Sequence, residues 1–226
     1  MLLETIGDLL PSAVGVALSP VPIIAVILVL GTPKARANGL AFAAGWLIGL
    51  IVVSSIVLIV ADDAADTDGP VSTGVSWIQI IIGGLFLLLA AKQWQGRPRE
   101  GEEVELPKWM AAVDTFSPRR SLLIGVALSG VNPKNLALTV AAAGSIAQAG
   151  LSGSDSAIAV AVFVIIGSLT VAGPVAFYLA APRRAAASLA TVQHFMSRHN
   201  AVIMMVVLLI LGVKVLGQGL AGVAVP

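Results

Sequence analysis

Six long apolar stretches dominate this sequence and restrict what it can fold into. They span residues 13–30, 40–61, 77–91, 121–143, 157–181 and 201–216. A helix of about 20 apolar residues crosses the ~30 Å hydrocarbon core of a membrane, and each stretch is near that length. Charged residues make up only 11% of the chain, whereas an average soluble domain has roughly 25%. We therefore predict an all-α, multi-pass membrane protein with six transmembrane helices, at residues 5–30, 38–61, 75–93, 120–148, 156–181 and 200–221.

Basic residues are concentrated in every second connection between these predicted helices. The first, third and fifth connections carry Lys34, Arg36, Arg97, Arg99, Lys108, Arg119, Arg120, Arg183, Arg184 and Arg198. The second connection is acidic, with Asp62, Asp63, Asp66 and Asp68, and the fourth contains Asp155. Because cytoplasmic loops carry an excess of Lys and Arg, the three basic connections are predicted to be cytoplasmic. Both termini are then extracytoplasmic, and the protein is expected in the plasma (inner) membrane.

A repeated phrase divides the chain into two halves. Residues 15–20 read GVALSP and residues 125–130 read GVALSG, 110 positions apart. Each half contains three predicted helices, so the halves must cross the membrane in opposite senses, as in many secondary transporters. We expect a first repeat at 1–94, a cytoplasmic linker at 95–118 and a second repeat at 119–226. The apolar residues of the linker recur with helical period over 106–116, which predicts a short amphipathic helix on the membrane surface.

Each copy of the phrase leads into a cluster of helix-breaking residues. The first cluster contains Ser19, Pro20 and Pro22, and the second contains Asn132 and Pro133. Proline lacks an N–H and frees a carbonyl one turn back, which the membrane tolerates only where protein, water or ligand satisfies it. Matched interruptions in two halves point to a binding site near the midplane. The alternative is that these prolines only kink their helices.

Two lysines lie inside predicted membrane helices. Lys134 is about fifteen residues into the fourth helix, and Lys214 lies in the sixth, nearer the outer face. A cation at such depth is costly and by default marks a substrate or ion path, although Lys214 could equally extend to the interface. With neighbouring amides, Lys134 would suit an anionic group such as phosphate, sulfate or carboxylate. The predicted substrate-binding residues are Ser19, Pro20, Pro22, Ser129, Asn132, Pro133, Lys134, Asn135 and Lys214.

Several classes of function find no support in the sequence. The formal net charge of +1 gives no electrostatic case for nucleic acid, and the absence of cysteine removes thiolate chemistry. No nucleotide-binding motif is present, and no acidic or histidine group lies at depth for acid–base work. We expect no cofactor, no metal site and no enzymatic activity. Gly45 and Gly49 form a GxxxG pattern, which serves close packing or formation of a homodimer.

The second half also carries a family resemblance. Pro107 to Trp109, the segment Asn132-Pro133-Lys134-Asn135 and the first-repeat motif SPVP at 19–22 resemble the GAP family of peptidoglycolipid- or sulfolipid-addressing proteins, in the LysE-type exporter superfamily. The resemblance covers most of the chain. It implies six helices in two inverted halves, and export or flipping of a glycolipid or envelope precursor. Asn132 and Lys134 match the family motif, so the resemblance places the site there.

Three functions follow from these observations. The leading one is a secondary-type transporter that exports or flips a glycolipid, or a lipid-linked envelope precursor, with an anionic head. Its partners would be membrane lipids and a lipid-like or small anionic substrate. The first alternative is a LysE-like exporter of amino acids or other small solutes and ions. The second alternative is a non-transporting membrane scaffold for envelope lipid synthesis.

Overall fold

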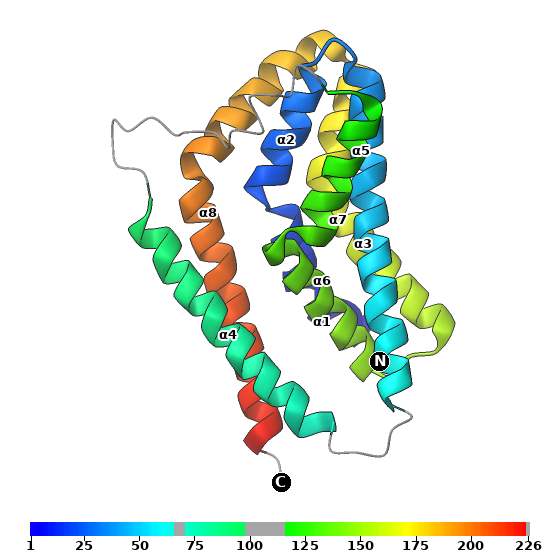
Figure 1. The fold of residues 1–226 in the computed structure, drawn as a ribbon, viewed down its shortest axis with the longest axis vertical. Coiled ribbons are helices and arrows are strands. Elements are labelled where there is room, and N and C mark those ends of the chain that lie inside the picture. The colour runs from blue at the N-terminus through cyan, green and yellow to red at the C-terminus, as the bar shows by residue number, and fades with distance from the viewer. Residues whose placement is uncertain (66–70, 98–115, 225–226) are drawn as a thin grey trace. The chain divides into compact units, whose positions relative to one another are not determined.

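The computed structural model describes residues 1–65, 71–97 and 116–224, and these residues are helical with no strand (Figure 1). The elements are α1 (Leu2–Ala17), α2 (Pro20–Leu30), α3 (Ala35–Ala65), α4 (Val71–Gln95), α5 (Pro118–Val126), the π-helix η2 (Ala127–Val131), α6 (Pro133–Gln148), α7 (Gly153–Ala180) and α8 (Pro182–Ala224). The six predicted segments are helical here, although the first (5–30) and the fourth (120–148) are each divided by a break, and the all-α prediction is confirmed. The predicted amphipathic helix at 106–116 lies almost wholly outside the described residues.

Three described helices are long and apolar enough to cross a membrane: Ala35–Ala61, Gly153–Ala180 and Pro182–Ala221. The pair α1 and α2, bent by 50° at its break, makes a fourth span if it is counted as one. The chain is therefore a membrane protein with three or four such spans in its described part. Six spans, the inverted repeat and the orientation of the termini stay predictions.

The last helix begins earlier than the sequence indicated. We expected a cytoplasmic connection before a helix starting at residue 200, whereas α8 runs without a break from Pro182 to Ala224. Proline is favoured in the first turn of a helix, where its missing N–H costs nothing. No further proline follows until residue 226, so nothing in the sequence stops the helix once it has begun.

Packing divides the chain into two compact units, which do not follow the boundaries of the predicted repeats. The first contains Met1–Leu58 and Val104–Arg198, and the second contains Ile59–Glu103 and His199–Pro226. In the first unit, α1 packs on α6 and α7, while α2 packs on α7. Its largest fully buried side chains include Trp46 and Phe42 of α3.

Helix α3 approaches α5 unusually closely in the first unit. A Cβ atom on Gly45 would overlap the carbonyl oxygen of Leu122 and would lie 2.9 Å from its carbonyl carbon. A Cβ on Gly125 of α5 would lie 2.9 Å from the backbone nitrogen of Trp46. Small residues let two backbones approach in a membrane. The GxxxG glycine at 45 is thus used for packing within one chain.

In the second unit, α4 packs against the C-terminal part of α8, again through glycine. A Cβ on Gly83 would lie 2.5 Å from the backbone nitrogen of Leu216. At the end of α4, the Arg97 guanidinium lies 3.8 Å from the centre of the Trp94 ring. This pairing suits the polar boundary of a membrane, where aromatic and basic side chains serve as anchors.

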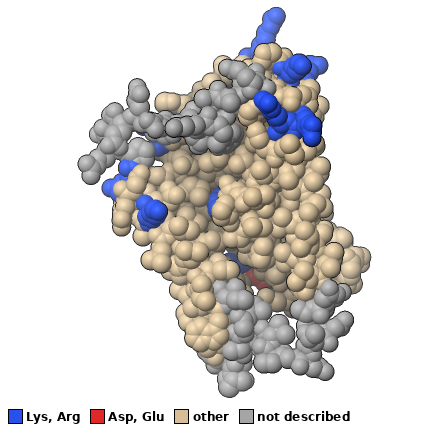
Figure 2. Space-filling model, in the orientation of Figure 1, with Lys and Arg blue, Asp and Glu red and all other residues tan. Residues whose placement is uncertain are grey.

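One end of the first unit is basic. Asn38 Nδ2, at the start of α3, donates a hydrogen bond of 3.0 Å to the Phe116 carbonyl just before α5. The start of α8 directly follows the end of α7 and lies at this same end (Figure 1). This end carries Lys34, Arg36, Arg119, Arg120, Arg183 and Arg184, and Figure 2 shows Lys and Arg gathered at the corresponding upper end of the molecule. The opposite end, where α7 begins, has Asp155. The cytoplasmic location of the basic end stays a prediction.

Candidate functional site

The two predicted helix breaks lie level with the middle of two long helices in the first unit. Gly49, near the centre of the Ala35–Ala61 span, lies against the second break, since a Cβ there would be 3.2 Å from Ser129 Cβ. Gly167, near the centre of α7, lies against the first break, since a Cβ there would be 3.3 Å from Val16 Cγ1. If α3 and α7 cross the membrane, both breaks lie near its midplane.

The first break separates α1 from α2 at Leu18 and Ser19. The Ser19 N–H bonds to the Val16 carbonyl at 3.2 Å, three residues back. A regular helix would pair this N–H with the Gly15 carbonyl, which is therefore left without a backbone donor. Carbonyls in the last turn of a helix have no partner within it and must find one elsewhere. Two side chains from other helices supply the partners. Lys134 Nζ donates to the Gly15 carbonyl at 2.8 Å, and Thr170 Oγ1 donates to the Ala17 carbonyl.

The second break is a π-helical turn followed by a proline. The Asn132 N–H bonds to the Ala127 carbonyl at 2.9 Å, five residues back, and the next bond of this series would come from Pro133. Proline has no N–H, so the Leu128 carbonyl is left over. Asn135 Nδ2 donates to it at 2.8 Å. The new helix α6 is capped by Asn132, whose Oδ1 accepts from the Lys134 N–H at 3.1 Å.

Lys134 joins the two breaks. It stands in the first turn of α6, where the partial positive charge of the helix N-terminus adds to its own ammonium charge. Its side chain is partly buried and reaches the Gly15 carbonyl in α1. Among the described residues no carboxylate pairs with it, and no cluster of His, Asp or Glu could hold a metal ion. Where the two breaks meet, the lysine ammonium is therefore paired with a neutral backbone carbonyl.

Most predicted site residues are brought together here. Asn132, Pro133, Lys134 and Asn135 form the second break, while Ser19, Pro20 and Pro22 are buried in the first. Ser129 is buried too, but its hydroxyl donates to the Gly125 carbonyl at 3.0 Å within its own helix. Lys214 belongs to α8 in the second unit, so it stays a separate prediction.

Sequence reasoning missed Thr170, which completes the first break. A threonine within an apolar helix carries no periodic signal, and its hydroxyl often bonds to its own helix. The side-chain oxygen of Asn135 is also an unused acceptor, because this buried Oδ1 accepts no hydrogen bond from the described residues. Buried polar atoms usually have a partner. This oxygen adjoins the break and could accept a bond from a substrate or water.

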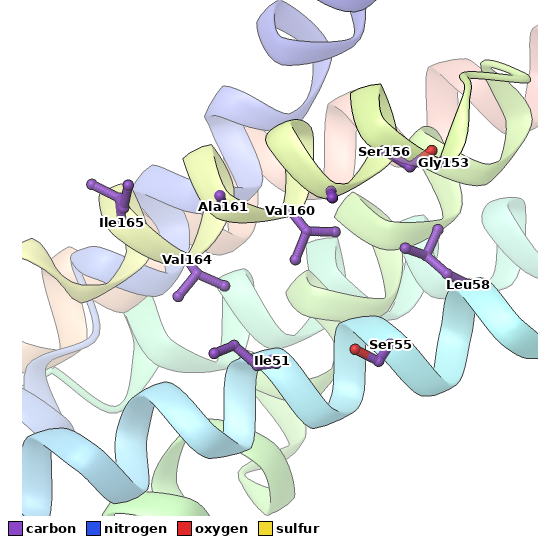
Figure 3. Close-up of a pocket in the computed structure, with 10 residues that line it drawn as sticks. Ile51, Ser55, Leu58, Gly153, Ser156, Val160, Ala161, Val164 and Ile165 are labelled. Carbon is purple, nitrogen blue, oxygen red and sulfur yellow. The ribbon is translucent and has the colours of Figure 1, made fainter.

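A pocket of about 580 Å³ lies in the same unit, between α3 and α7 (Figure 3). Its lining residues are Ile51, Ser55, Leu58, Gly153, Ser156, Ala157, Val160, Ala161, Val164 and Ile165. None of them is a predicted site residue. Apart from two serine hydroxyls, the lining side chains are apolar.

Comparison with known proteins gives one match. A family model described as "Sap, sulfolipid-1-addressing protein" matches residues 9–221, which is most of the chain. No curated protein and no solved structure matches. The match confirms the sulfolipid-addressing part of the resemblance seen in the sequence, while the wider exporter superfamily stays a prediction.

Proposed function

This chain belongs to the Sap, sulfolipid-1-addressing protein family, and we propose that it is a secondary-type transporter that moves a lipid with an anionic head across the plasma membrane. The observation that carries the proposal is the hydrogen bond of 2.8 Å between Lys134 Nζ and the Gly15 carbonyl. It places a cation, with no acidic partner among the described residues, where two broken helices cross. A cation at such depth in a membrane is expensive and marks a substrate path by default.

The chemistry of this crossing favours an anionic oxygen as ligand. The Lys134 ammonium already makes a charge-assisted bond to a neutral carbonyl, and an anionic oxygen adds a Coulomb attraction that the carbonyl lacks. A sulfate, phosphate or carboxylate oxygen would therefore compete with the Gly15 carbonyl for Lys134. The N-terminus of α6 adds its dipole to the same ligand. The unused Oδ1 of Asn135 could accept a bond from a hydroxyl of the head.

This competition suggests how binding would lead to movement. With no substrate, Lys134 ties α6 to α1 through Gly15. When an anionic head binds the Lys134 ammonium, the hydrogen bond to Gly15 breaks, and the Gly15 carbonyl loses its partner. The two broken segments are then free to shift relative to each other, and the site opens alternately to the two sides.

The test follows a fluorescent anionic glycolipid between the leaflets of proteoliposomes, with a membrane-impermeant quencher added outside. We compare the wild type, Lys134→Ala, Lys134→Arg and the control Lys92→Ala, which removes an exposed lysine of α4 in the second unit. Losing a hydrogen bond to a charged group costs ~1.5–3 kcal/mol, so Lys134→Ala should slow movement roughly tenfold or more. Lys134→Arg should retain part of the rate, and Lys92→Ala should equal the wild type.

The other outcomes point to the alternative functions. Wild-type protein that moves no lipid but releases loaded amino acids would make the chain a small-solute exporter. Equal lipid movement by the wild type and Lys134→Ala, with both folded, would make Lys134 a structural cap. Absence of any transport, with intact binding of envelope enzymes, would favour a scaffold.

A further inference from the structure

The pocket between α3 and α7 is open at its side. Ile51 of α3 is 46% exposed and Ile165 of α7 is 62% exposed, although both line the pocket. Ala157 and Ala161 lie one turn apart on α7 and are also exposed. Figure 3 shows Val160 and Val164 directed from α7 toward Ile51 and Ser55 on α3. The pocket is thus a lateral groove between two helices.

The length of the groove along α7 corresponds to about half the thickness of a membrane's hydrocarbon core. Its inner end, at Ile51 and Ile165, lies two residues from Gly49 and Gly167, which contact the two breaks. Its outer end is at Gly153, where α7 begins. At ~1.5 Å per residue, the twelve steps from Gly153 to Ile165 cover roughly 18 Å. One leaflet contributes about half of the ~30 Å hydrocarbon core, so the groove matches the depth of one leaflet.

The half that contains the groove is the one away from the basic end. The basic residues lie at the end of α7, and the groove runs from the middle of α7 to its start. If the basic end is cytoplasmic, the groove faces the outer leaflet. The apolar walls of the groove would then be in contact with lipid chains rather than with water.

From these observations we propose that the groove between α3 and α7 binds one acyl chain of the transported lipid on the extracytoplasmic side. This inference rests on the proposed function and adds the place where one chain lies when the head is at the extracytoplasmic surface, after it has left the breaks. The methyl end of the chain lies toward Val164 and the midplane. The polar end of the chain lies near Ser156, whose hydroxyl can donate to an ester carbonyl. Apolar walls with a few placed polar groups, and a volume of several hundred Å³, are typical of sites for such ligands.

The test uses phosphatidylglycerol with a photoreactive diazirine at the end of one acyl chain, in vesicles of phosphatidylcholine and phosphatidylglycerol. After illumination, mass spectrometry maps the labelled residues. The control position is Leu169, which is 58% exposed, lies about as near the middle of α7 as Ile165 and does not line the groove. We expect saturable labelling of Val160, Val164 and Ile165, several-fold above Leu169. Labelling in proportion to exposure alone, with Leu169 equal to Ile165, would overturn the proposal.

Filling the groove gives a second readout. Ala161→Phe should reduce both the labelling and the movement of lipid several-fold. Ile158→Phe, at an exposed position of α7 that does not line the groove, should change neither. Ala157→Leu adds a smaller side chain in the same groove and serves if Ala161→Phe does not fold. A groove that is labelled and then blocked as expected, in a protein that moves no lipid, would keep the chain site and reject the proposed transport. Lipid movement that is unchanged in both filled variants would reject the chain site and keep the transport.

Discussion

Replacing Gly45 with alanine tests whether the close contact of α3 and α5 holds the first unit together. An added Cβ would overlap the Leu122 carbonyl oxygen and would lie 2.9 Å from its carbonyl carbon and 3.1 Å from its Cα. All three atoms are backbone, so no side-chain rotation relieves the clash. The two helices must separate instead, and α5 leads directly into the second break. The change should therefore disturb the site as well as the packing.

The magnitude follows from two opposing effects. Overpacking a close contact costs typically ~1–3 kcal/mol, and more when the backbone must move. Alanine in a helix gains up to ~1 kcal/mol over glycine through its propensity. Gly144 of α6 has no atom within 4 Å of its added Cβ, so Gly144→Ala reports the propensity gain alone. The difference between the two variants isolates the clash and should be roughly 1–3 kcal/mol.

Thermal unfolding in detergent measures this difference. At about 2–4 °C per kcal/mol for a chain of this length, Gly45→Ala should melt roughly 2–12 °C below Gly144→Ala. The difference should not depend on protein concentration, because the contact lies within one chain. A midpoint equal to or above that of Gly144→Ala would refute the close contact. A difference that grows on dilution would instead place Gly45 in a homodimer interface.

Two further predictions concern other contacts. Thr170→Val keeps the shape of the side chain but removes the hydroxyl that donates to the Ala17 carbonyl, so the free energy of unfolding should fall by ~1–3 kcal/mol. Thr170→Ser should restore most of this stability, and a Thr170→Val variant as stable as the wild type would contradict the role of the hydroxyl. In α4, Gly83→Ala should lower the melting temperature because its Cβ would lie 2.5 Å from the Leu216 nitrogen, whereas Gly84→Ala meets nothing within 4 Å and should not; equal melting of the two would show that α4 does not pack there.

The helices themselves could be predicted well, because a long apolar stretch in a membrane protein satisfies its backbone hydrogen bonds within its own helix. The breaks at 18–19 and 132 could be predicted too, since proline removes an N–H wherever it stands. The start of α8 could not, because Arg183, Arg184 and Arg198 read as a loop from charge alone. Charge sets which side of the membrane a segment faces, and it does not end a helix.

By itself, the sequence determined that this chain is a helical membrane protein with two matched proline breaks and a lysine in one of them. Those features depend on local chemistry, on hydropathy and on which residues lack an N–H. Only the tertiary structure decided which group satisfies each freed carbonyl. Lys134 donates to the Gly15 carbonyl from 119 residues away in the sequence, and Thr170 donates to the Ala17 carbonyl from 153 residues away. The tertiary structure also decided where the groove between α3 and α7 lies. The sequence could not predict these pairings, because any donor near a freed carbonyl would satisfy it. Which donor lies there depends on which helices pack together.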